Sequence, residues 1–278
     1  MKTILITGCS SGFGRVTALH LARRGWRVFA TVRKPADRES LLAEASGLPL
    51  DALLCDVTDP AQVSSLFQSI RAAAPALDAL LNNAGTAYPA PVELLPLDDL
   101  RRQLEINVVG QVAVIQAALP LLKAARGVIV NVSSMGGRIA FPITGAYHAS
   151  KFALEALSDS LRIELAPFGV RVVVLEPGGS PTAIWGTGEA NAGSVLADPG
   201  AEAYRPLMDR YLRLARASAR NGFPPQAFAD LVERVLADPR PRARYTLGRN
   251  TALNLFARRL LPDWAWDAVI RRVFRWPG

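Results

Sequence analysis

The sequence contains few cysteines and histidines, and this scarcity excludes several kinds of site. Its 278 residues include two cysteines, Cys9 and Cys55, and two histidines. The cysteines form neither a disulfide framework nor a metal-ligand cluster, so we expect no metal site. We interpret both as small buried residues near a cofactor pocket in a reducing compartment, and we therefore expect a cytoplasmic protein.

The sequence also lacks a long uninterrupted apolar run. No stretch of about eighteen uncharged apolar residues occurs, so no membrane-spanning helix is expected. The apolar stretch within residues 1–8 is too short for a secretory signal and reads better as a buried first strand.

The net charge of +8 is concentrated near the C-terminus. Residues 240–278 contain nine arginines against Asp263 and Asp267, whereas the 23 basic and 22 acidic residues of 1–239 nearly cancel. The basic character therefore belongs to one segment, and we expect no nucleic-acid binding by the main body.

Apolar runs alternate with helical-period segments along most of the chain. Runs such as residues 127–132 are continuously apolar, as expected of strands that helices cover on both faces. This alternation predicts the α/β class, with one domain over residues 1–278 built on a Rossmann-type, doubly wound parallel sheet of about seven strands. The predicted strands are 3–7, 27–32, 50–55, 79–82, 127–132, 170–175 and 243–247, and the main helices are 14–24, 60–73, 97–125, 149–166 and 224–236.

Two segments depart from this alternation. Residues 178–224 contain several glycines and prolines, among them Gly193, followed by a helical stretch at about 204–220. An insertion of this length without an obvious strand is more often a substrate lid than an idle loop. Residues 249–278 form the second segment, a basic helical C-terminal extension.

The extension shows an amphipathic pattern. Its apolar residues at helical spacing are Trp266, Val269, Ile270, Val273 and Phe274, and Asp263, Asp267, Arg271 and Arg275 lie four apart on the other side. One interpretation is an interfacial membrane helix, because further arginines and tryptophans lie nearby. We favour the other, a helix docked on its own body or on a partner subunit with its basic face in solvent.

A glycine-rich loop follows the first predicted strand and opens the first predicted helix. Glycines let the backbone turn tightly and approach a pyrophosphate, whose charge is favoured at a helix N-terminus. An ordinary strand–helix turn is the alternative, but the strand before and the helix after are both present. The loop predicts a dinucleotide site, and its candidate cofactor-binding residues are Gly8, Ser10, Ser11, Gly12, Phe13 and Gly14.

The end of the second predicted strand favours NADP(H) over NAD(H). An NAD site usually has an acidic residue there for the ribose 2′-hydroxyl, and an NADP site uses arginine for the 2′-phosphate. Val32 stands where the acid would be, and Arg33 follows it. A guanidinium can hold a phosphate with two hydrogen bonds, whereas a carboxylate would repel it. A solvated pair of Arg33 and Lys34 is the alternative.

Tyr147 and Lys151 stand four residues apart at the start of a helical segment, which places a phenol and an ammonium on one helix face. The cation is expected to lower the tyrosine pKa toward neutrality, where general acid/base chemistry works best. Ser134 precedes the tyrosine by thirteen residues. Together with the glycine loop, these residues predict a nicotinamide-dependent redox enzyme.

These motifs, taken in order, carry a family resemblance. With the glycine loop, Asn82 to Gly85, Ser134, the Tyr147 and Lys151 pair and Pro177-Gly178, the chain resembles the short-chain dehydrogenase/reductase family. The likeness covers roughly residues 3–180 and continues more loosely through the seventh predicted strand. The residues around Arg33 and the arginine-rich C-terminus are similar to the branch that contains hydroxysteroid and retinol dehydrogenases.

The resemblance implies a role for each matched position. Tyr147 would be the catalytic acid/base, Ser134 would hold the substrate oxygen, and Lys151 would bind the nicotinamide ribose while lowering the Tyr147 pKa. Asn107 would support a proton-relay water. The further cofactor contacts would be Asp56 and Val57 at the adenine, Asn83, Ala84 and Gly85 beyond the fourth strand, and Pro177, Gly178 and Thr182 at the nicotinamide amide.

Some of these assignments have structural alternatives. Ser134, with Ser133 beside it, could cap the end of the fifth strand, and Asn107 could cap backbone within its helix. His148 is interpreted as a bystander because side chains at i and i+1 diverge on a helix. Residues 179–181 are less bulky than the apolar pair often found there in the family, which leaves the lid conformation open.

Apolar and aromatic residues dominate the segments expected to face the substrate, which are 86–95, 135–145 and 178–220. This favours a small hydrophobic alcohol or carbonyl compound over a charged metabolite, although many of these side chains could simply pack the lid on the body. The candidates are Tyr88, Met135, Ile139, Phe141, Ile184, Trp185, Tyr204 and Met208.

These observations predict an NADP(H)-dependent oxidoreductase that interconverts a hydrophobic secondary alcohol and ketone, or an alcohol and aldehyde. Helices 97–125 and 148–166 could pair across a two-fold axis to give a homodimer or homotetramer. Two other functions are a non-catalytic dinucleotide sensor and a lipid- or membrane-binding protein on the same fold. The complete set of Asn107, Ser134, Tyr147 and Lys151 speaks against the sensor.

Overall fold

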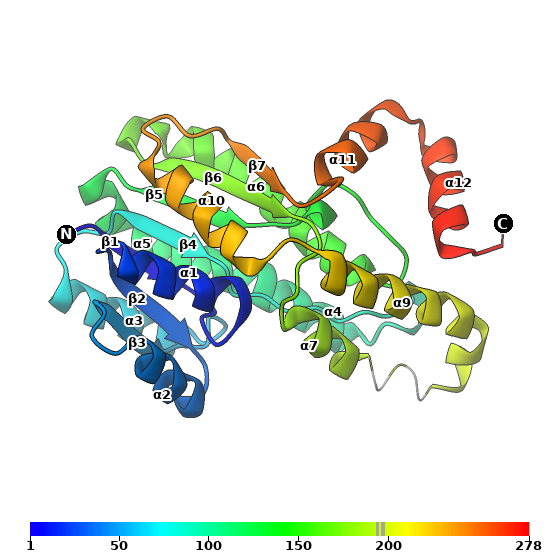
Figure 1. Ribbon diagram of the computed structural model, residues 1–278, viewed down its shortest axis with the longest axis horizontal. Coiled ribbons are helices and arrows are strands. Elements are labelled where there is room, and N and C mark those ends of the chain that lie inside the picture. The colour runs from blue at the N-terminus through cyan, green and yellow to red at the C-terminus, as the bar shows by residue number, and fades with distance from the viewer. Residues whose placement is uncertain (193–194, 196–197, 278) are drawn as a thin grey trace.

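A seven-stranded parallel sheet lies at the centre of the protein (Figure 1). The computed structural model describes residues 1–192, 195 and 198–277. The strand order is β3-β2-β1-β4-β5-β6-β7, which confirms the predicted doubly wound sheet and its number of strands. The strands are β1 (Thr3–Ile6), β2 (Arg27–Val32), β3 (Leu50–Leu54), β4 (Ala79–Asn82), β5 (Val128–Val132), β6 (Arg171–Pro177) and β7 (Arg244–Leu247).

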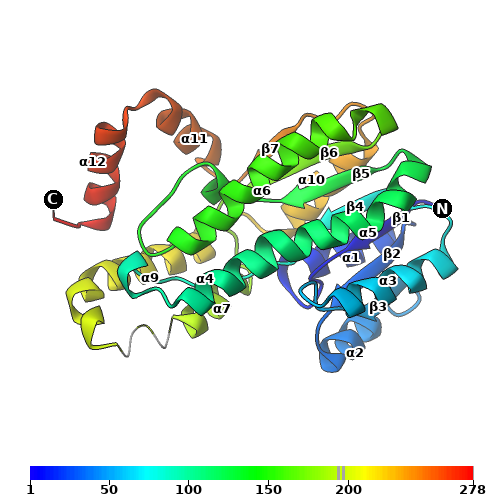
Figure 2. The ribbon, with the colours of Figure 1, turned by 180° about the vertical axis from the view of Figure 1, so that it is seen from behind.

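Helices cover both faces of the sheet, as the apolar strands require. One face packs against α1 (Gly12–Arg23), α2 (Pro35–Glu44) and α10 (Pro225–Ala237), as Figure 1 shows. The other packs against α3 (Pro60–Ala73), α5 (Gly110–Ala125) and α6 (Gly145–Glu164), seen from behind in Figure 2. Successive strand residues point to opposite faces, so Ile4 and Ile6 enter the first apolar layer and Leu5 the second.

The predicted helix over 97–125 consists of three parts. They are α4 (Leu97–Leu104), a π-helical turn (Glu105–Val109) and α5, which follow one another without a break. By length and composition alone, Leu97–Ala125 is the one helix in the described residues that could cross a membrane, with a mean hydropathy of 1.6 over its most apolar window. Its apolar side chains Val114, Ile115 and Leu122 are buried against one face of the sheet, as in a core helix, and 39% of that window is buried in all.

The segment after β6 is helical. It contains α7 (Ile184–Asn191), a 3₁₀ turn (Pro199–Tyr204) and α9 (Arg205–Asn221), which corresponds to the helical stretch predicted at about 204–220. Gly193, one of the glycines that marked this segment in the sequence, lies outside the described residues. A third apolar cluster, which includes Met208 and Phe274, joins α9 to the C-terminal extension.

The extension forms α11 (Thr251–Leu260) and α12 (Asp263–Phe274), which project at one end of the molecule (Figure 1). The Arg210 guanidinium donates a hydrogen bond to the Val273 carbonyl at 2.9 Å, and the Trp276 ring stacks on Tyr204 with 6.0 Å between ring centres. The end of the extension therefore docks on α9 of its own chain, as the favoured interpretation expected.

Candidate active site

The predicted site residues converge at the carboxyl edge of the sheet. The glycine loop follows β1, residues 83–85 follow β4, Ser134 follows β5, and Pro177 ends β6. β1 lies between β2 and β4, so the chain order reverses there. In open α/β sheets, ligands bind in the crevice that this reversal creates.

The glycine loop has the conformation that a pyrophosphate site requires. Gly8 and Gly12 have φ angles of 72° and 57°, in the left-handed region that favours glycine. A Cβ on Gly14 would lie 2.3 Å from the Gly8 carbonyl oxygen, so the helix start packs directly against the loop. The side chain of Ser11, the N-cap of α1, makes no capping hydrogen bond, which leaves the first helical N–H groups available to an anion.

Two side chains, those of Thr7 and Asn83, hold this loop through hydrogen bonds. The Thr7 hydroxyl accepts hydrogen bonds from the backbone N–H groups of Asn83 and Ala84, both at 2.9 Å. The Asn83 amide donates to the carbonyls of Thr7 and Gly8 at 2.8 and 3.1 Å. Asn83, predicted as a cofactor contact, thus holds the loop with its own side chain. No role for Thr7 was predicted from the sequence. A hydroxyl at the end of a buried apolar strand could have indicated one.

The predicted adenine side of the site is formed by the ends of β2 and β3. Val32 is buried and Arg33 is exposed directly after it. The Asp56 carboxylate accepts two hydrogen bonds, at 2.8 and 3.0 Å, from the threonine two residues later, and so shapes the turn before α3. Val57 is buried, and its carbonyl oxygen would lie 2.8 Å from a Cβ placed on Gly110. The arginine is therefore available to a ligand, while Asp56 also has a structural role.

Ser134, Tyr147 and Lys151 lie together, as predicted. The Ser134 hydroxyl accepts a hydrogen bond from the Gly136 N–H at 3.0 Å, donates to the Pro177 carbonyl at 3.5 Å, and lies close enough to the Tyr147 hydroxyl to influence the tyrosine pKa. Ser134 therefore caps the turn after β5 and also faces the tyrosine. The Lys151 ammonium donates to the Val132 carbonyl at 2.7 Å and lies 5.9 Å from the centre of the Tyr147 ring.

The expected lowering of the tyrosine pKa is not found, and that prediction was wrong for the chain by itself. Burial raises the pKa of Tyr147 above its ordinary value, and the nearby Ser134 hydroxyl opposes this shift. Lys151 does not reverse it, because its ammonium is directed to the Val132 carbonyl and burial lowers the pKa of the lysine itself to about 8. At neutral pH Tyr147 is therefore a phenol, in the form that can donate a proton.

Asn107 is fully buried in the π-helical turn before α5. Its amide oxygen accepts from the Thr86 N–H at 2.9 Å, and its amide nitrogen donates to the Thr86 carbonyl and to the Ser150 hydroxyl at 3.0 and 3.1 Å. Ser150 in turn donates to the Tyr147 carbonyl at 2.6 Å. Asn107 thus connects the catalytic helix to the loop after β4. The relay-water role stays a prediction, and the part of Ser150, three residues after Tyr147, was missed.

His148 has a structural position. Its ring nitrogens make hydrogen bonds with the Gly136 carbonyl at 2.9 Å and with the Thr144 hydroxyl at 2.8 Å. Burial lowers the pKa of His148, so the ring is neutral near pH 7. This agrees with the interpretation of His148 as a bystander to the chemistry. Its hydrogen bond to the Gly136 carbonyl nevertheless holds the turn that Ser134 caps.

The segment after β6 lies beside the glycine loop. The Gly178 N–H donates to the Leu247 carbonyl at 2.7 Å, which fixes the strand end. A Cβ on Gly12 would be 3.3 Å from the Thr182 Cβ, so Thr182 borders the loop. Thr182 therefore lies at the glycine loop, and contact of Pro177, Gly178 and Thr182 with the nicotinamide amide stays a prediction.

A cavity of about 170 Å³ lies between the body and the helices after β6, and the residues that line it do not include Ser134, Tyr147 or Lys151. Its lining is mostly apolar and comprises Pro89, Ile143, Glu189, Ala192, Met208, Tyr211, Leu212 and Arg216. Burial and the negative charge that Tyr147 can carry raise the pKa of Tyr211 to about 12, which places the two phenols within electrostatic reach. That Tyr211 lines this cavity was not predicted from the sequence.

Two of the side chains predicted to contact the substrate make other contacts in the structure. Of the eight candidates, Met208 lines the cavity. The Tyr204 hydroxyl donates to the Glu93 carboxylate at 2.6 Å, and the Trp185 indole donates to the Ser180 carbonyl at 2.8 Å. The alternative, that such residues pack the segment on the body, is correct for these two.

Comparison with known proteins gives consistent matches. A family model described as short chain dehydrogenase matches residues 2–192. The chain is 38% identical over 277 residues to the uncharacterized oxidoreductase YusZ of Bacillus subtilis, with 98% of each protein covered. It is 38% identical over 288 residues to retinol dehydrogenase 5 of Mus musculus, with 99% of this chain and 89% of that protein covered.

A solved structure shows the same likeness in three dimensions. A short-chain dehydrogenase from Streptomyces avermitilis superposes with a TM-score of 0.77 at 28% sequence identity. The match covers 99% of this chain and 95% of that one. The likeness predicted for residues 3–180 therefore extends over nearly the whole chain, including the segment after β6 and the C-terminal extension.

Proposed function

The chain belongs to the short-chain dehydrogenase family, and from that premise we propose that it is an NADP(H)-dependent oxidoreductase that interconverts a hydrophobic secondary alcohol and ketone, or an alcohol and aldehyde. The observation that carries the proposal is the grouping of Ser134, Tyr147 and Lys151, in which the serine hydroxyl lies close enough to the tyrosine to influence its pKa and the lysine ammonium lies 5.9 Å from the tyrosine ring centre. Two hydroxyls this near to each other can both contact one substrate oxygen.

The glycine loop, Arg33 and residues 177–182 would hold the dinucleotide, because the loop offers uncapped N–H groups and leaves no room for side chains at Gly8 and Gly14. When bound, the cofactor supplies or accepts a hydride. The protein's part is to stabilise the charge that develops on the substrate oxygen, with Ser134 donating a hydrogen bond and the phenol of Tyr147 donating a proton.

Replacement of the phenolic hydroxyl tests the chemistry. Tyr147→Phe keeps the ring and removes the proton donor, so turnover of a responsive carbonyl compound should fall by at least about 10²- to 10⁴-fold. Oxidation of NADPH, followed by its fluorescence, measures the loss. Tyr245→Phe is the matched control, since the hydroxyl of Tyr245, in the edge strand β7, accepts its hydrogen bond from the Arg242 N–H just before that strand. Turnover that survives in the Tyr147 variant contradicts the mechanism.

The cavity supports a hydrophobic substrate. Pro89, Ile143, Met208 and Leu212 provide apolar walls, and Tyr211 adds one hydroxyl near the catalytic tyrosine. A relative named retinol dehydrogenase 5 agrees with this class. A panel of aliphatic, steroidal and retinoid carbonyl compounds, with small charged keto acids as the comparison, tests it. Preference for the charged compounds would contradict the proposal.

The proposed preference for NADP(H) depends on Arg33, which is exposed after the buried Val32. A hydrogen bond to a charged group contributes about 1.5–3 kcal/mol, so Arg33→Ala should weaken NADPH binding by roughly 10- to 150-fold. Binding of NADH, which lacks the 2′-phosphate, should change little. Lys34→Ala removes a neighbouring charge and is the control. Equal losses for both cofactors would show that Arg33 does not recognise the phosphate.

We also propose that the protein works in the cytoplasm at an anionic membrane surface. The side chains of Leu253, Phe256, Leu260 and Trp264 in the extension are 60–75% exposed, beside arginines that suit anionic lipid. Flotation with phosphatidylserine vesicles tests this contact. The double variant Phe256→Ser, Trp264→Ser should bind weakly, whereas Phe168→Ser, at an exposed phenylalanine far from the extension in sequence, should bind like the unchanged protein. Equal binding by both contradicts the proposal.

A homodimer or homotetramer through 97–125 and 148–166 is the proposed assembly. Three large apolar residues on these helices are exposed to solvent. Phe152 and Ile163 of α6 are 45% and 74% exposed, and Val109 of the π-helical turn is 51% exposed. Such side chains can be covered by a second copy. Sedimentation should show a dimer or tetramer that Phe152→Glu with Ile163→Glu dissociates. A monomer at micromolar concentration would contradict this assembly.

A further inference from the structure

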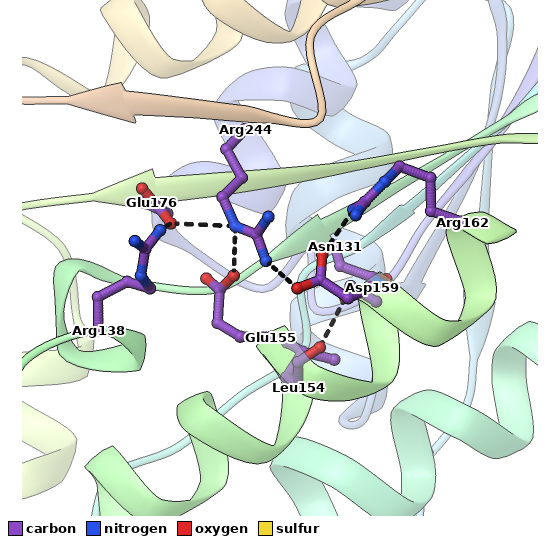
Figure 3. Close-up of polar contacts among 9 residues, drawn as sticks. Asn131, Arg138, Leu154, Glu155, Asp159, Arg162, Glu176 and Arg244 are labelled. Atoms are coloured by element: carbon purple, nitrogen blue, oxygen red, sulfur yellow. Dashed lines mark hydrogen bonds and ion pairs between the residues drawn. The ribbon is translucent and has the colours of Figure 1, made fainter.

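A network of charged side chains, of which Glu155 and Glu176 are buried, is shown in Figure 3. It joins α6, β6, β7 and the turn after β5. Arg244 of β7 is its centre, with hydrogen bonds or ion pairs to Glu155 at 2.9 Å, Asp159 at 2.8 Å and Glu176 at 3.5 Å. Two further arginines complete it, Arg138 at 3.1 Å from Glu176 and Arg162 at 2.6 Å from Asp159. None of these residues was predicted to belong to the site.

Glu155 is the member of this network closest to Lys151 along the chain. It follows Lys151 by four residues, so the two side chains lie on one face of α6. Both residues are buried, Glu155 with 5% and Lys151 with 4% of its surface exposed. The negative charge of Glu155 raises the pKa of Lys151, against the larger opposite effect of burial.

The ammonium of Lys151 requires this compensation. Its hydrogen bond to the Val132 carbonyl satisfies one N–H but supplies no opposite charge. A buried ammonium without a negative partner loses its proton. The other carboxylates are less suited, because Asp159 is a further turn along α6 and is shared by two arginines, and Glu176 contacts Arg138.

The remaining polar atoms around Glu155 support an oriented carboxylate. One of its oxygens accepts from Arg244, and the other has no hydrogen-bond partner in the part of the chain that the structure describes. That second oxygen and the Ser133 hydroxyl lie 3.2 and 2.5 Å from where a Cβ on Gly137 would stand. The glycine therefore leaves space for the Glu155 side chain beside β5.

We propose that Glu155 is a positioning residue for Lys151. Its carboxylate, held in place by Arg244, keeps the lysine ammonium charged and directed at the Val132 carbonyl, and so sets the upper pH limit at which the site works. The inference rests on the proposed function only in that Lys151 takes part in the reaction. On α6, β6 and β7 the charged residues outside the network, apart from Lys151 itself, are Glu164 and Arg171, and the latter donates to the Asp238 carbonyl. Tyr147 and His148 are the titratable side chains that precede Lys151 on α6.

The four lysines of the chain make a direct test practical. NMR of lysine labelled with ¹³C and ¹⁵N follows the titration of Lys151 beside Lys2, Lys34 and Lys123, which serve as internal references. Glu155→Gln should move the Lys151 midpoint to lower pH by about one unit or more, as expected for loss of an opposite charge at close range. Asp159→Asn removes a carboxylate bound to the same arginine and should shift it much less.

Two more variants keep the test decisive. Arg244→Gln removes the guanidinium that holds the Glu155 carboxylate and should move the Lys151 midpoint to lower pH, by less than Glu155→Gln does, which gives a result even if Glu155→Gln does not fold. Glu155→Asp keeps the charge and should restore most of the original midpoint. An unchanged midpoint in Glu155→Gln, or in Arg244→Gln, overturns the inference, as does an equal shift in Asp159→Asn.

Turnover separates this inference from the proposed function. In carbonyl reduction, the alkaline limb of the kcat/KM profile of Glu155→Gln should move to lower pH along with the NMR midpoint. Absence of turnover with every carbonyl compound would refute the proposed function, while the NMR midpoints would still decide the role of Glu155. Turnover with an unshifted Lys151 midpoint would refute the role of Glu155 alone.

Discussion

The hydroxyl of Thr7 offers a sharp test of how the cofactor loop is held. Thr7 is fully buried at the end of β1, and its oxygen accepts from the N–H groups of Asn83 and Ala84. Thr7→Val replaces the hydroxyl by a methyl group of similar size. The two N–H groups then lose their acceptor, and no water can reach the buried oxygen position to replace it.

The magnitude follows from these two bonds, both 2.9 Å long. Each buried donor left without a partner costs about 1–3 kcal/mol, so the loss is about 2–6 kcal/mol. The added buried methyl group returns roughly 0.8 kcal/mol. Thr7→Val should therefore reduce the free energy of unfolding by roughly 1–5 kcal/mol, a large part of the ~5–15 kcal/mol typical of a folded protein.

Thr17 in α1 provides a matched control. It is also fully buried, but its hydroxyl has no hydrogen-bond partner among the described residues. Thr17→Val removes an unsatisfied polar atom and gains the same methyl burial, so it should be neutral or stabilising by roughly 1 kcal/mol. The difference between the two variants isolates the hydrogen bonds of Thr7.

Urea denaturation, followed by tryptophan fluorescence and by circular dichroism, measures both variants. The Thr7 variant should also bind the dinucleotide more weakly, because the loop carbonyls and the Asn83 amide are no longer aligned by the strand end. Equal free energies of unfolding for Thr7→Val and Thr17→Val would refute the reasoning, since the two substitutions differ only in the bonds removed.

Two further predictions concern packing and pH. A Cβ on Gly110 would lie 2.8 Å from the Val57 carbonyl oxygen, so Gly110→Ala should lower the free energy of unfolding by about 1–3 kcal/mol, whereas Gly186→Ala, with no atom within 4 Å, should not. Burial lowers the pKa of Lys151 from an ordinary 10.5 to about 8. Below pH 8 the lysine is charged in both the folded and the unfolded chain, and the cost of burying that charge lowers the free energy of unfolding. This cost is lost as the pH rises from 8 to 10.5, because the folded chain then holds a neutral lysine. The excess stability of Lys151→Met over the unchanged protein should therefore shrink between pH 8 and 10.5 in the same denaturation assay, and a constant difference would contradict the assigned shift.

Much of the fold could be predicted because its signals are local. Each strand is a short apolar run with a helical-period segment after it, so the order of elements follows from the sequence. The glycine loop was recognisable for the same reason. Gly8 and Gly12 adopt left-handed backbone conformations and Gly14 packs closely on Gly8, all within a few residues of one another. Tyr147 and Lys151 were visible because a helix converts a spacing of four into proximity.

Other parts of the site depend on contacts between distant segments. Thr7 meets Asn83 across 76 residues, and Arg244 meets Glu155 across 89. No local pattern marks such pairs, because each side chain alone resembles an ordinary strand or helix residue. The cavity shows the same limit, since Tyr211 borders it while the equally aromatic Tyr204 faces Glu93.

By itself, the sequence determined the α/β class, the order of strands and helices along the chain and the identity of the Ser134, Tyr147 and Lys151 group, because these depend on short-range periodicity and spacing. Only the tertiary structure decided the ionisation of that group. Burial raises the pKa of Tyr147 and lowers that of Lys151, against the direction that their spacing alone suggests for the tyrosine. Desolvation depends on every atom packed around a side chain, and those atoms come from segments that only the fold brings together.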